Sequence, residues 1–279
     1  MRGRVHLTLS AAISCVVIAA SHHADASRLQ MVPSVESHVD EAAQAVALKW
    51  TVTNEGDESA QEVALDLPAL NESHSLANSM APQEKATVEV TIPFDRLGIQ
   101  QRGAYGVFYR VLYKDANLYS FSAPYSTTVI LPPAPTRVLS AAPDGFSEIS
   151  LASRAAAAIT AQNVTSIEAN IDKLEPVAPV EIGIALRDAQ LPIKLKPGER
   201  RGLRFDLTRS GALEGATYVV GALASGVAGD RHFAERISFT VRIVAPLVSG
   251  RSLMIAALAV VVAGTMLFWL WQRRRAIRA

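Results

Sequence analysis

The sequence predicts an all-β protein: two β-sandwich domains in tandem, followed by one C-terminal transmembrane helix. Three observations predict this class. Apolar and polar residues alternate over much of residues 27–250, as in strands with one buried and one solvated face. Three prolines in Pro132–Pro135 divide that alternation into two halves. Near the C-terminus, Leu253–Trp271 is a run of 19 residues without a charge.

The N-terminus has the features of a secretory signal peptide. Two arginines in the first four residues precede the apolar run Leu7–Ala20, and Ala24-Asp25-Ala26 then offers the small-x-small pattern that signal peptidase cuts. We expect residues 1–26 to be removed, because the run is short for an anchor that stays. The one cysteine, Cys15, lies inside this run, so the exported protein would have no disulfide.

The C-terminal run predicts a transmembrane helix over residues 252–272. Nineteen residues make about 28 Å of helix, close to the ~30 Å hydrocarbon core of a bilayer. Four arginines follow, which places the basic tail of residues 273–279 in the cytoplasm. We expect a single-pass protein of the cell membrane with its other domains outside the cytoplasm. The lack of cysteine there favours a bacterial periplasm over an animal cell surface. Removal of the helix as a sorting tag is the alternative.

The first domain is predicted over residues 27–131, from four stretches in which apolar residues take every second position. Clusters of turn-forming residues separate these stretches at 54–57, 81–84 and 114–117. One side of each strand would face a core and the other would face solvent. The apolar sets are Val46, Leu48, Trp50 and Val52; Val63, Leu65 and Leu67; Ala86, Val88, Val90 and Ile92; and Tyr105, Val107, Tyr109, Val111 and Tyr113.

The second domain is predicted over residues 137–246, after a stiff proline-rich linker at 132–136. Its size matches that of the first domain. About seven short strands in roughly 105–115 residues suit a β-sandwich of the immunoglobulin kind, here without the inter-sheet disulfide. The apolar sets are Val180, Ile182, Ile184 and Leu186; Ile193 and Leu195; Leu203, Phe205 and Leu207; and Ile237, Phe239, Val241 and Ile243.

The two halves repeat one turn. Ala81-Pro82-Gln83-Glu84 in the first half matches Lys196-Pro197-Gly198-Glu199 in the second, and an alternating strand follows each. The opening of the second half, Ile159–Val164, lacks the glycine turn that the first half has at Asn54-Glu55-Gly56-Asp57. The repeat is therefore expected only from about Pro197 onward.

The first of these openings resembles a known family. The run Leu48–Asp57, followed by Val63–Leu67, is similar to the opening hairpin of bacterial and archaeal cell-adhesion-related Ig-like domains, the CARDB and NEW3-like group. The resemblance implies tandem Ig-like domains on an envelope protein with a C-terminal membrane anchor. It implies a fold more than an activity.

No motif of catalysis or metal binding stands out between residues 27 and 250. His38, His74 and His232 show no metal-ligand spacing; we expect His74 in a polar loop, Asn71–Ser79, and His232 in a turn. No phosphate loop, nucleophile elbow or dinucleotide fingerprint occurs there. We therefore expect neither an enzyme nor a cofactor, metal or small-molecule ligand. This part has 20 basic and 25 acidic residues, which argues against binding of nucleic acid.

Three features remain as candidate binding sites. The acidic turn, residues 54–58, offers oxygen ligands for calcium but lacks the EF-hand spacing, so a polar hairpin turn is the preferred interpretation. The tyrosines on one face of residues 105–113 are expected in the core rather than on a ligand platform. A basic cluster, expected on one hairpin, could meet an anionic partner, or it could simply blunt a strand edge. Its residues are Lys194, Lys196, Arg200, Arg201 and Arg204.

Taken together, these features predict a non-enzymatic interaction scaffold or accessory protein. Its membrane-anchored Ig-like domains would bind an envelope or surface protein through sheet edges, loops or the basic cluster. The alternative is a membrane-tethered periplasmic chaperone or assembly factor, which would offer an unpaired strand edge between the domains to an unfolded client.

Overall fold

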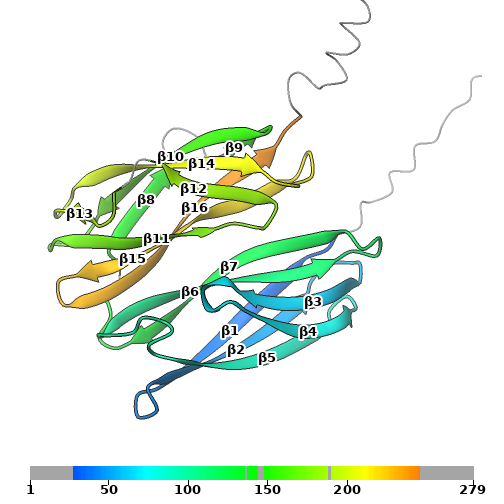
Figure 1. Cartoon of the computed structure of the whole chain (residues 1–279), viewed down its shortest axis with the longest axis horizontal. Coiled ribbons are helices and arrows are strands. Elements are labelled where there is room, and N and C mark those ends of the chain that lie inside the picture. The colour runs from blue at the N-terminus through cyan, green and yellow to red at the C-terminus, as the bar shows by residue number, and fades with distance from the viewer. Residues whose placement is uncertain (1–27, 136, 144–147, 188–189, 246–279) are drawn as a thin grey trace, which may run out of the picture.

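The computed structural model describes residues 28–135, 137–143, 148–187 and 190–245, and within them the chain is almost entirely β-structure. The one helical element there is a 3-10 turn, Pro68–Leu70. The strands form paired sheets, and Figure 1 shows two sandwiches that lie one against the other. The predicted all-β class is confirmed for this part of the chain.

The first sandwich packs a three-stranded sheet, ordered β1-β2-β5, on a four-stranded sheet, ordered β4-β3-β6-β7. This is a seven-stranded plan of the immunoglobulin kind, with the fourth strand paired to the third. The strands are β1 (Met31–Asp40), β2 (Ala45–Asn54), β3 (Ala60–Leu67), β4 (Glu72–Met80), β5 (Lys85–Pro93), β6 (Gly103–Lys114) and β7 (Ser120–Leu131).

The second sandwich packs β12-β14-β10-β8 on β13-β11-β15-β16, and β9 adds to the edge of β16. Pro132–Pro135 lies between β7 and β8, where the chain passes from one sandwich to the next. The strands are β8 (Leu139–Pro143), β9 (Glu148–Leu151), β10 (Arg154–Asn163), β11 (Ala169–Val177), β12 (Ile182–Arg187), β13 (Ile193–Leu195), β14 (Arg200–Arg209), β15 (Thr217–Ala228) and β16 (Arg231–Ile243).

The alternating residues fill two separate cores, as their spacing predicts. On β2, the four alternating apolar residues are completely buried: Val46, Leu48, Trp50 and Val52. Among them Trp50 meets Tyr109 edge-on, with ring centroids 5.7 Å apart. In the second sandwich Leu203, Phe205 and Leu207 of β14 alternate with more exposed residues in the same way. Strands of this pattern are the part of the fold that local sequence determines most directly.

Three local expectations are wrong. His232 does not lie in a turn, because it is the second residue of β16. Asn71–Ser79 is not a loop, because Glu72–Met80 forms β4, which pairs along its length with β3. Its polar residues hide the alternation, and the residues that pack on the core are Leu76, Ala77 and Met80. Val180 does not belong to the strand of Ile182; it precedes β12 and is 54% exposed.

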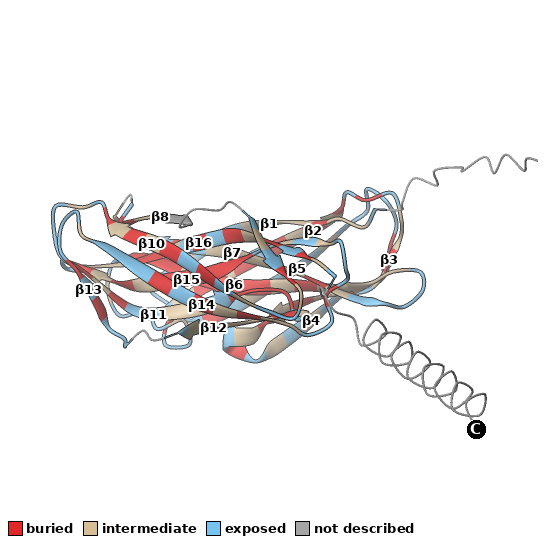
Figure 2. Ribbon diagram, turned by 90° about the horizontal axis from the view of Figure 1, so that it is seen from above, coloured by how far each residue is buried: buried red, intermediate tan, exposed pale blue. Residues whose placement is uncertain are grey.

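The two sandwiches meet through their adjoining sheets. His232 of β16 pairs with Gly103 of β6 in a parallel bridge, which joins the sheets into one. Beside the bridge, Phe108 from the first sandwich is buried against apolar residues of the second, and Figure 2 shows buried residues along β6, β15 and β16. The cluster consists of Phe108, Val177, Leu223 and Ala234.

Polar contacts fix the same junction. The imidazole of His232 stacks on Tyr105, with ring centroids 4.0 Å apart, and its Nδ1 lies 2.7 Å from the Ala104 carbonyl oxygen. Burial lowers the pKa of His232. Further along, the carboxylate of Glu181 accepts hydrogen bonds from the amide and hydroxyl of Ser122. The linker alone therefore does not hold the sandwiches together.

The predicted signal peptide (1–26), transmembrane helix (252–272) and basic tail (273–279) lie outside the described residues. Among the residues that are described, no helix is long and apolar enough to cross a membrane.

Candidate functional site

The five basic residues singled out by sequence are all exposed, but they do not share one surface. Lys194 lies on β13, which pairs with β11, whereas Arg200, Arg201 and Arg204 lie on β14, which pairs with β10 and β12. The two strands thus belong to opposite sheets of the sandwich, and Lys196 lies in the turn between them. The expectation of a single hairpin is wrong because this turn crosses between sheets.

The fold instead gathers four arginines on the outer face of the β12-β14-β10 sheet. Arg204 lies opposite Arg187 of β12, and Arg154 of β10 lies opposite Thr208, four residues further along β14. Arg200 stands at the other end of β14. We call this surface the arginine face and define it by Arg154, Arg187, Arg200 and Arg204, all exposed.

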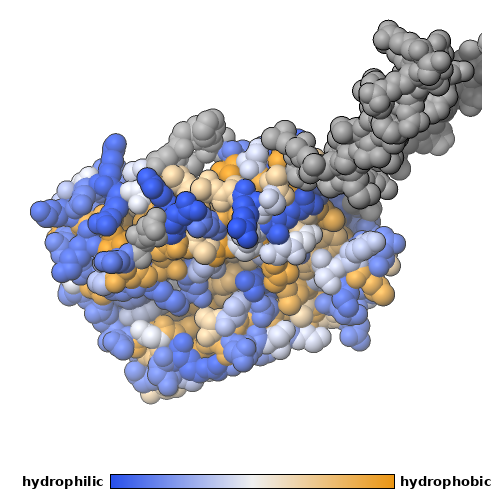
Figure 3. All heavy atoms as spheres, turned by 45° about the horizontal axis from the view of Figure 1, so that its top comes forward, coloured by the Kyte–Doolittle hydropathy of each residue, from blue (hydrophilic) through white to orange (hydrophobic). Residues whose placement is uncertain are grey.

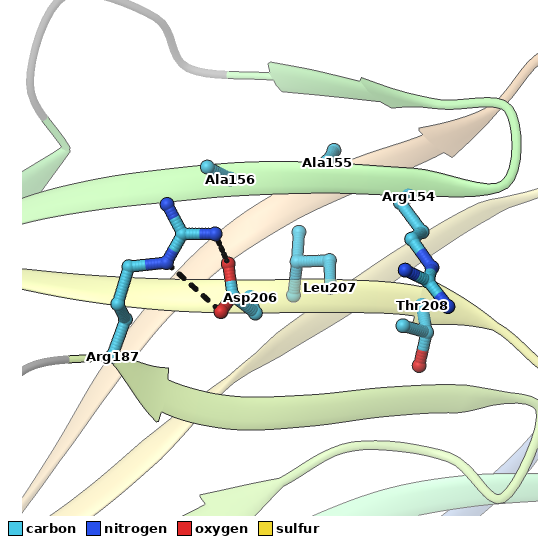
Figure 4. A pocket seen from close by; sticks show the side chains of 7 residues that line it. All are labelled: Arg154, Ala155, Ala156, Arg187, Asp206, Leu207 and Thr208. Atoms are coloured by element: carbon cyan, nitrogen blue, oxygen red, sulfur yellow. Dashed lines mark hydrogen bonds and ion pairs between the residues drawn. The ribbon is translucent and has the colours of Figure 1, made fainter.

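Small residues form the floor between these arginines. Ala156 and Ala158 of β10, Ala185 of β12 and Gly202 of β14 are exposed on the same side of the sheet. A shallow hollow of about 360 Å³ lies at one part of this floor, lined by Ala156 together with Asp206 and Thr208, with Arg154 and Arg187 on opposite sides of it (Figure 4). In Figure 3, hydrophilic side chains on the second sandwich are separated by more apolar surface. A partner can therefore approach the sheet closely while the guanidinium groups surround it.

The charge of the arginine face is mostly uncompensated. Arg187 makes a bidentate pair with Asp206, with Nε 2.9 Å from Oδ2 and Nη2 2.6 Å from Oδ1. Arg200 donates to the side-chain oxygen of Gln162 at 3.2 Å. Within the described part of the chain, Arg154 and Arg204 have no carboxylate partner. Among the described residues of this face, four arginines and one aspartate leave a net charge of +3.

Arg154 and Arg187 could not be found from the sequence. Neither lies near the 194–204 cluster in the chain, and only the pairing of β10 and β12 with β14 brings them to it. The sequence does show one common feature: each of these arginines lies at the end of a stretch of small and apolar residues.

The remaining candidate sites are structural. In the acidic turn, the Asp57 carboxylate accepts a hydrogen bond from the Arg28 amide at 2.6 Å, and Asn54 points inward. Tyr105 and Tyr109 are buried, as expected for a core, and burial raises the pKa of Tyr113 to about 12. His74 lies 3.2 Å from Glu72, whose pKa is lowered chiefly by a hydrogen bond from Arg96. The described residues contain no group of three or more His, Cys, Asp or Glu side chains that could hold a metal.

No protein-family model matches the chain, and a comparison with characterised proteins finds none of similar sequence. Solved structures with a similar arrangement include a protein of unknown function from Porphyromonas gingivalis W83, with a TM-score of 0.31 and 13% identity over 76% of this chain and 99% of that one. Another is Salmonella alpha-2-macroglobulin, with a TM-score of 0.32 and 12% identity over 77% of this chain and 16% of that one. The YadV chaperone scores 0.27, with 12% identity over 74% of this chain and 99% of that one.

These likenesses concern β-rich, sandwich-like architecture and carry no argument about activity. The similarity to the CARDB and NEW3-like group remains a similarity of short motifs, since no family match accompanies it.

Proposed function

We propose that this protein is a non-enzymatic, extracytoplasmic interaction scaffold, held on the cell membrane by Leu253–Trp271, and that its arginine face binds an acidic surface of an envelope protein. The observation that carries the proposal is the set of four exposed arginines over a floor of small residues. Guanidinium groups form paired hydrogen bonds with carboxylates, and arginine is enriched at protein interfaces whereas lysine is depleted.

The junction supports a scaffold role. The parallel bridge, the cluster around Phe108 and the bonds from Ser122 to Glu181 make one body of two sandwiches. A rigid body presents its surface in a fixed orientation, so less conformational entropy is lost when a partner binds.

The chaperone alternative needs an unpaired strand edge between the sandwiches. Part of that position is taken, because β6 and β16 bridge there and the Glu235 carboxylate accepts from the amides of Val138 and Leu139. The scaffold is therefore the function that the geometry supports better.

Capture of partners by charge-reversed variants tests the proposal. The full chain in mild detergent serves as bait for an envelope extract, and Arg154→Glu/Arg204→Glu is compared with Lys194→Glu/Lys196→Glu, which changes charge equally on another surface. We expect one envelope complex to be captured by the wild type and the lysine variant, and lost from the arginine variant and at high salt. Equal capture by both variants contradicts the proposal, and capture of many unfolded exported proteins supports the chaperone.

A further inference from the structure

Exposed apolar side chains lie at both ends of the molecule, and the four most exposed of those described all lie at one end. Nine large hydrophobic residues are exposed among those described, and five of them lie in or beside the loops at the end where β6 and β16 finish and β12 begins. Contacts between these loops tie the end together: the Val180 amide donates to the Ser122 hydroxyl at 2.7 Å, and the Gly215 amide donates to the Ile243 carbonyl at 2.9 Å. The five are Leu118, Tyr119, Val180, Leu213 and Val219.

The β6–β7 turn holds the most exposed pair. Leu118 is 62% exposed and Tyr119 is 68% exposed. The Asp115 carboxylate fixes the turn by accepting from the amides of Asn117 and Tyr119, both at 2.9 Å. This geometry gives Leu118 a φ of 63°, a left-handed conformation in which leucine is strained and glycine or asparagine is comfortable. A strained, exposed leucine gains nothing from packing within the described part of the molecule.

The chain enters and leaves the described structure at this same end. Arg28 bonds to Asp57, and the neighbouring Glu58 accepts from the Ala116 amide in the β6–β7 turn. At the other terminus, β16 ends at Ile243 and the described chain at Ala245. Seven residues separate Ala245 from Leu253, so this end lies within about 27 Å of the start of the uncharged run.

We propose that this end rests on the outer surface of the bilayer, with Leu118 and Tyr119 in the boundary between headgroups and acyl chains. The inference rests on the membrane anchoring of the proposed function. Burial of leucine drives the contact, and tyrosine is enriched at membrane interfaces because it has an apolar ring and a polar hydroxyl. Asp115 and Glu58 lie beside the turn, and their acidic side chains would not attract anionic lipid. The contact is therefore apolar and does not require anionic lipid.

This orientation gives the arginine face a direction. β14 runs from Arg200, at the far end, to Arg209, near the apolar end. With the apolar end on the membrane, the strands of the second sandwich extend away from the bilayer, and the arginine face points parallel to the membrane plane. A neighbouring envelope protein could then reach that face within the plane of the membrane.

Fluorescence quenching by lipid-borne nitroxide tests the contact. The full chain with Cys15 replaced by serine is reconstituted in phosphatidylcholine–phosphatidylethanolamine vesicles, with bimane on a single cysteine at Asn117, Ser166 or Val260. Asn117 adjoins Leu118, Ser166 lies in the exposed turn after β10 at the opposite end, and Val260 lies in the uncharged run. We expect quenching at 117 to exceed that at 166 several-fold and to change little when phosphatidylglycerol is added.

Leu118→Asn separates membrane contact from folding. Asparagine tolerates the left-handed conformation, so the melting temperature should hold or rise while quenching at 117 falls several-fold. Quenching at 260 with equal, weak quenching at 117 and 166 overturns this inference and leaves the anchoring intact. Absence of quenching at 260 overturns the anchoring itself, and the inference with it.

Discussion

Asn54 in the first sandwich and Asn163 in the second are completely buried asparagines that make the same hydrogen bonds in turns of different sequence. The Asn54 amide group donates to Glu58 and Met80 carbonyls at 2.8 and 3.0 Å, and that of Asn163 donates to Ile167 and Leu195 carbonyls at 2.7 and 2.9 Å. In both, the side-chain oxygen accepts the amide two residues on. We call each arrangement an asparagine clasp.

Each asparagine clasp also binds the repeated proline turn. The main-chain amide of Asn54 donates to the Glu84 carbonyl, and the main-chain carbonyl of Asn54 accepts from the Gln83 amide. The main chain of Asn163 makes the same two bonds with Glu199 and Gly198. The clasp thus ties the end of β2 to the turn before β5, and the end of β10 to the turn before β14.

The clasps differ where glycine appears. Gly56 is needed in the first, because a Cβ there would lie 2.1 Å from the Arg28 carbonyl oxygen. The second has Thr165 at that place, and its hydroxyl donates to Asn163 at 2.7 Å. In the proline turn the glycine is in the second sandwich instead: Gly198 has a φ of 74°, and the equivalent residue of the first sandwich, Gln83, has a φ of 66°. The asparagine, not the glycine, is therefore what the two sandwiches share.

Removing the clasp asparagines should produce the largest effect. Asn163→Ala leaves the buried Leu195 carbonyl without its partner, and Asn54→Ala does the same to Met80. Each should lower the free energy of unfolding by about 3 kcal/mol, with Asn163 the more costly because Thr165 adds a bond. Urea unfolding in detergent, followed by circular dichroism, measures this. Thr53→Ala and Gln162→Ala are the neighbouring controls, and losses no larger than theirs would show that the clasps are unimportant.

Alkaline pH should destabilise the first sandwich more than the second. Burial raises the pKa of Tyr109, Tyr113 and Tyr125 in the first, whereas the second contains only Tyr218. Unfolded tyrosine ionises near pH ~10, so the stabilisation is complete below that pH and is lost as the pH rises toward the folded value, about 12 for Tyr113. The first sandwich should therefore unfold first.

Trp50 fluorescence reports this when Trp269 and Trp271 are replaced by phenylalanine. Its change should precede the loss of overall β-sheet signal, and Tyr113→Phe should move it to higher pH. Simultaneous loss of both signals in all variants would mean that the tyrosines do not distinguish the sandwiches.

Exchanging the residues of the proline turn should have smaller, opposite effects. Gly198→Gln places a side chain in a left-handed conformation in otherwise open space and should destabilise by about 1 kcal/mol. Gln83→Gly relieves the same strain and should stabilise by a little less, since glycine loses more entropy on folding. Melting temperatures of the two variants check the signs; shifts in the same direction would refute the equivalence of the turns.

The smallest effect is expected at the turn carboxylates. Glu84 accepts from the Ala81 amide at 2.7 Å, and Glu199 accepts from the Lys196 amide at 2.8 Å. Glu84→Gln and Glu199→Gln keep an acceptor but lose its charge, at an exposed site for Glu84 and a partly exposed site for Glu199, so each should cost about 0.5 kcal/mol. Equal small losses in melting temperature would support the repeat, and a loss at only one turn would count against it.

Local pattern explains what could be predicted here. β2, β14 and β16 were evident because every second residue enters a core. The proline turn is evident in the sequence as a repeat, but the sequence does not show that Asn163 corresponds to Asn54, because the glycine of the first turn has no counterpart in the second. The junction was missed because Phe108 and Leu223 lie among buried residues on both sides of their strands. The sequence reveals Arg200 and Arg204 of the arginine face but not Arg154 and Arg187, because only pairing between distant strands brings these two to β14.

Photocrosslinking from the arginine face tests the central claim most directly. Benzoylphenylalanine at Ala158, which lies opposite Arg204, is compared in intact cells with the same group at Thr87, exposed on β5 of the first sandwich. The account predicts one discrete crosslinked envelope protein from position 158, lost in Arg154→Glu/Arg204→Glu, and none from position 87. No crosslink at 158, or the same crosslinks from both positions, would contradict it.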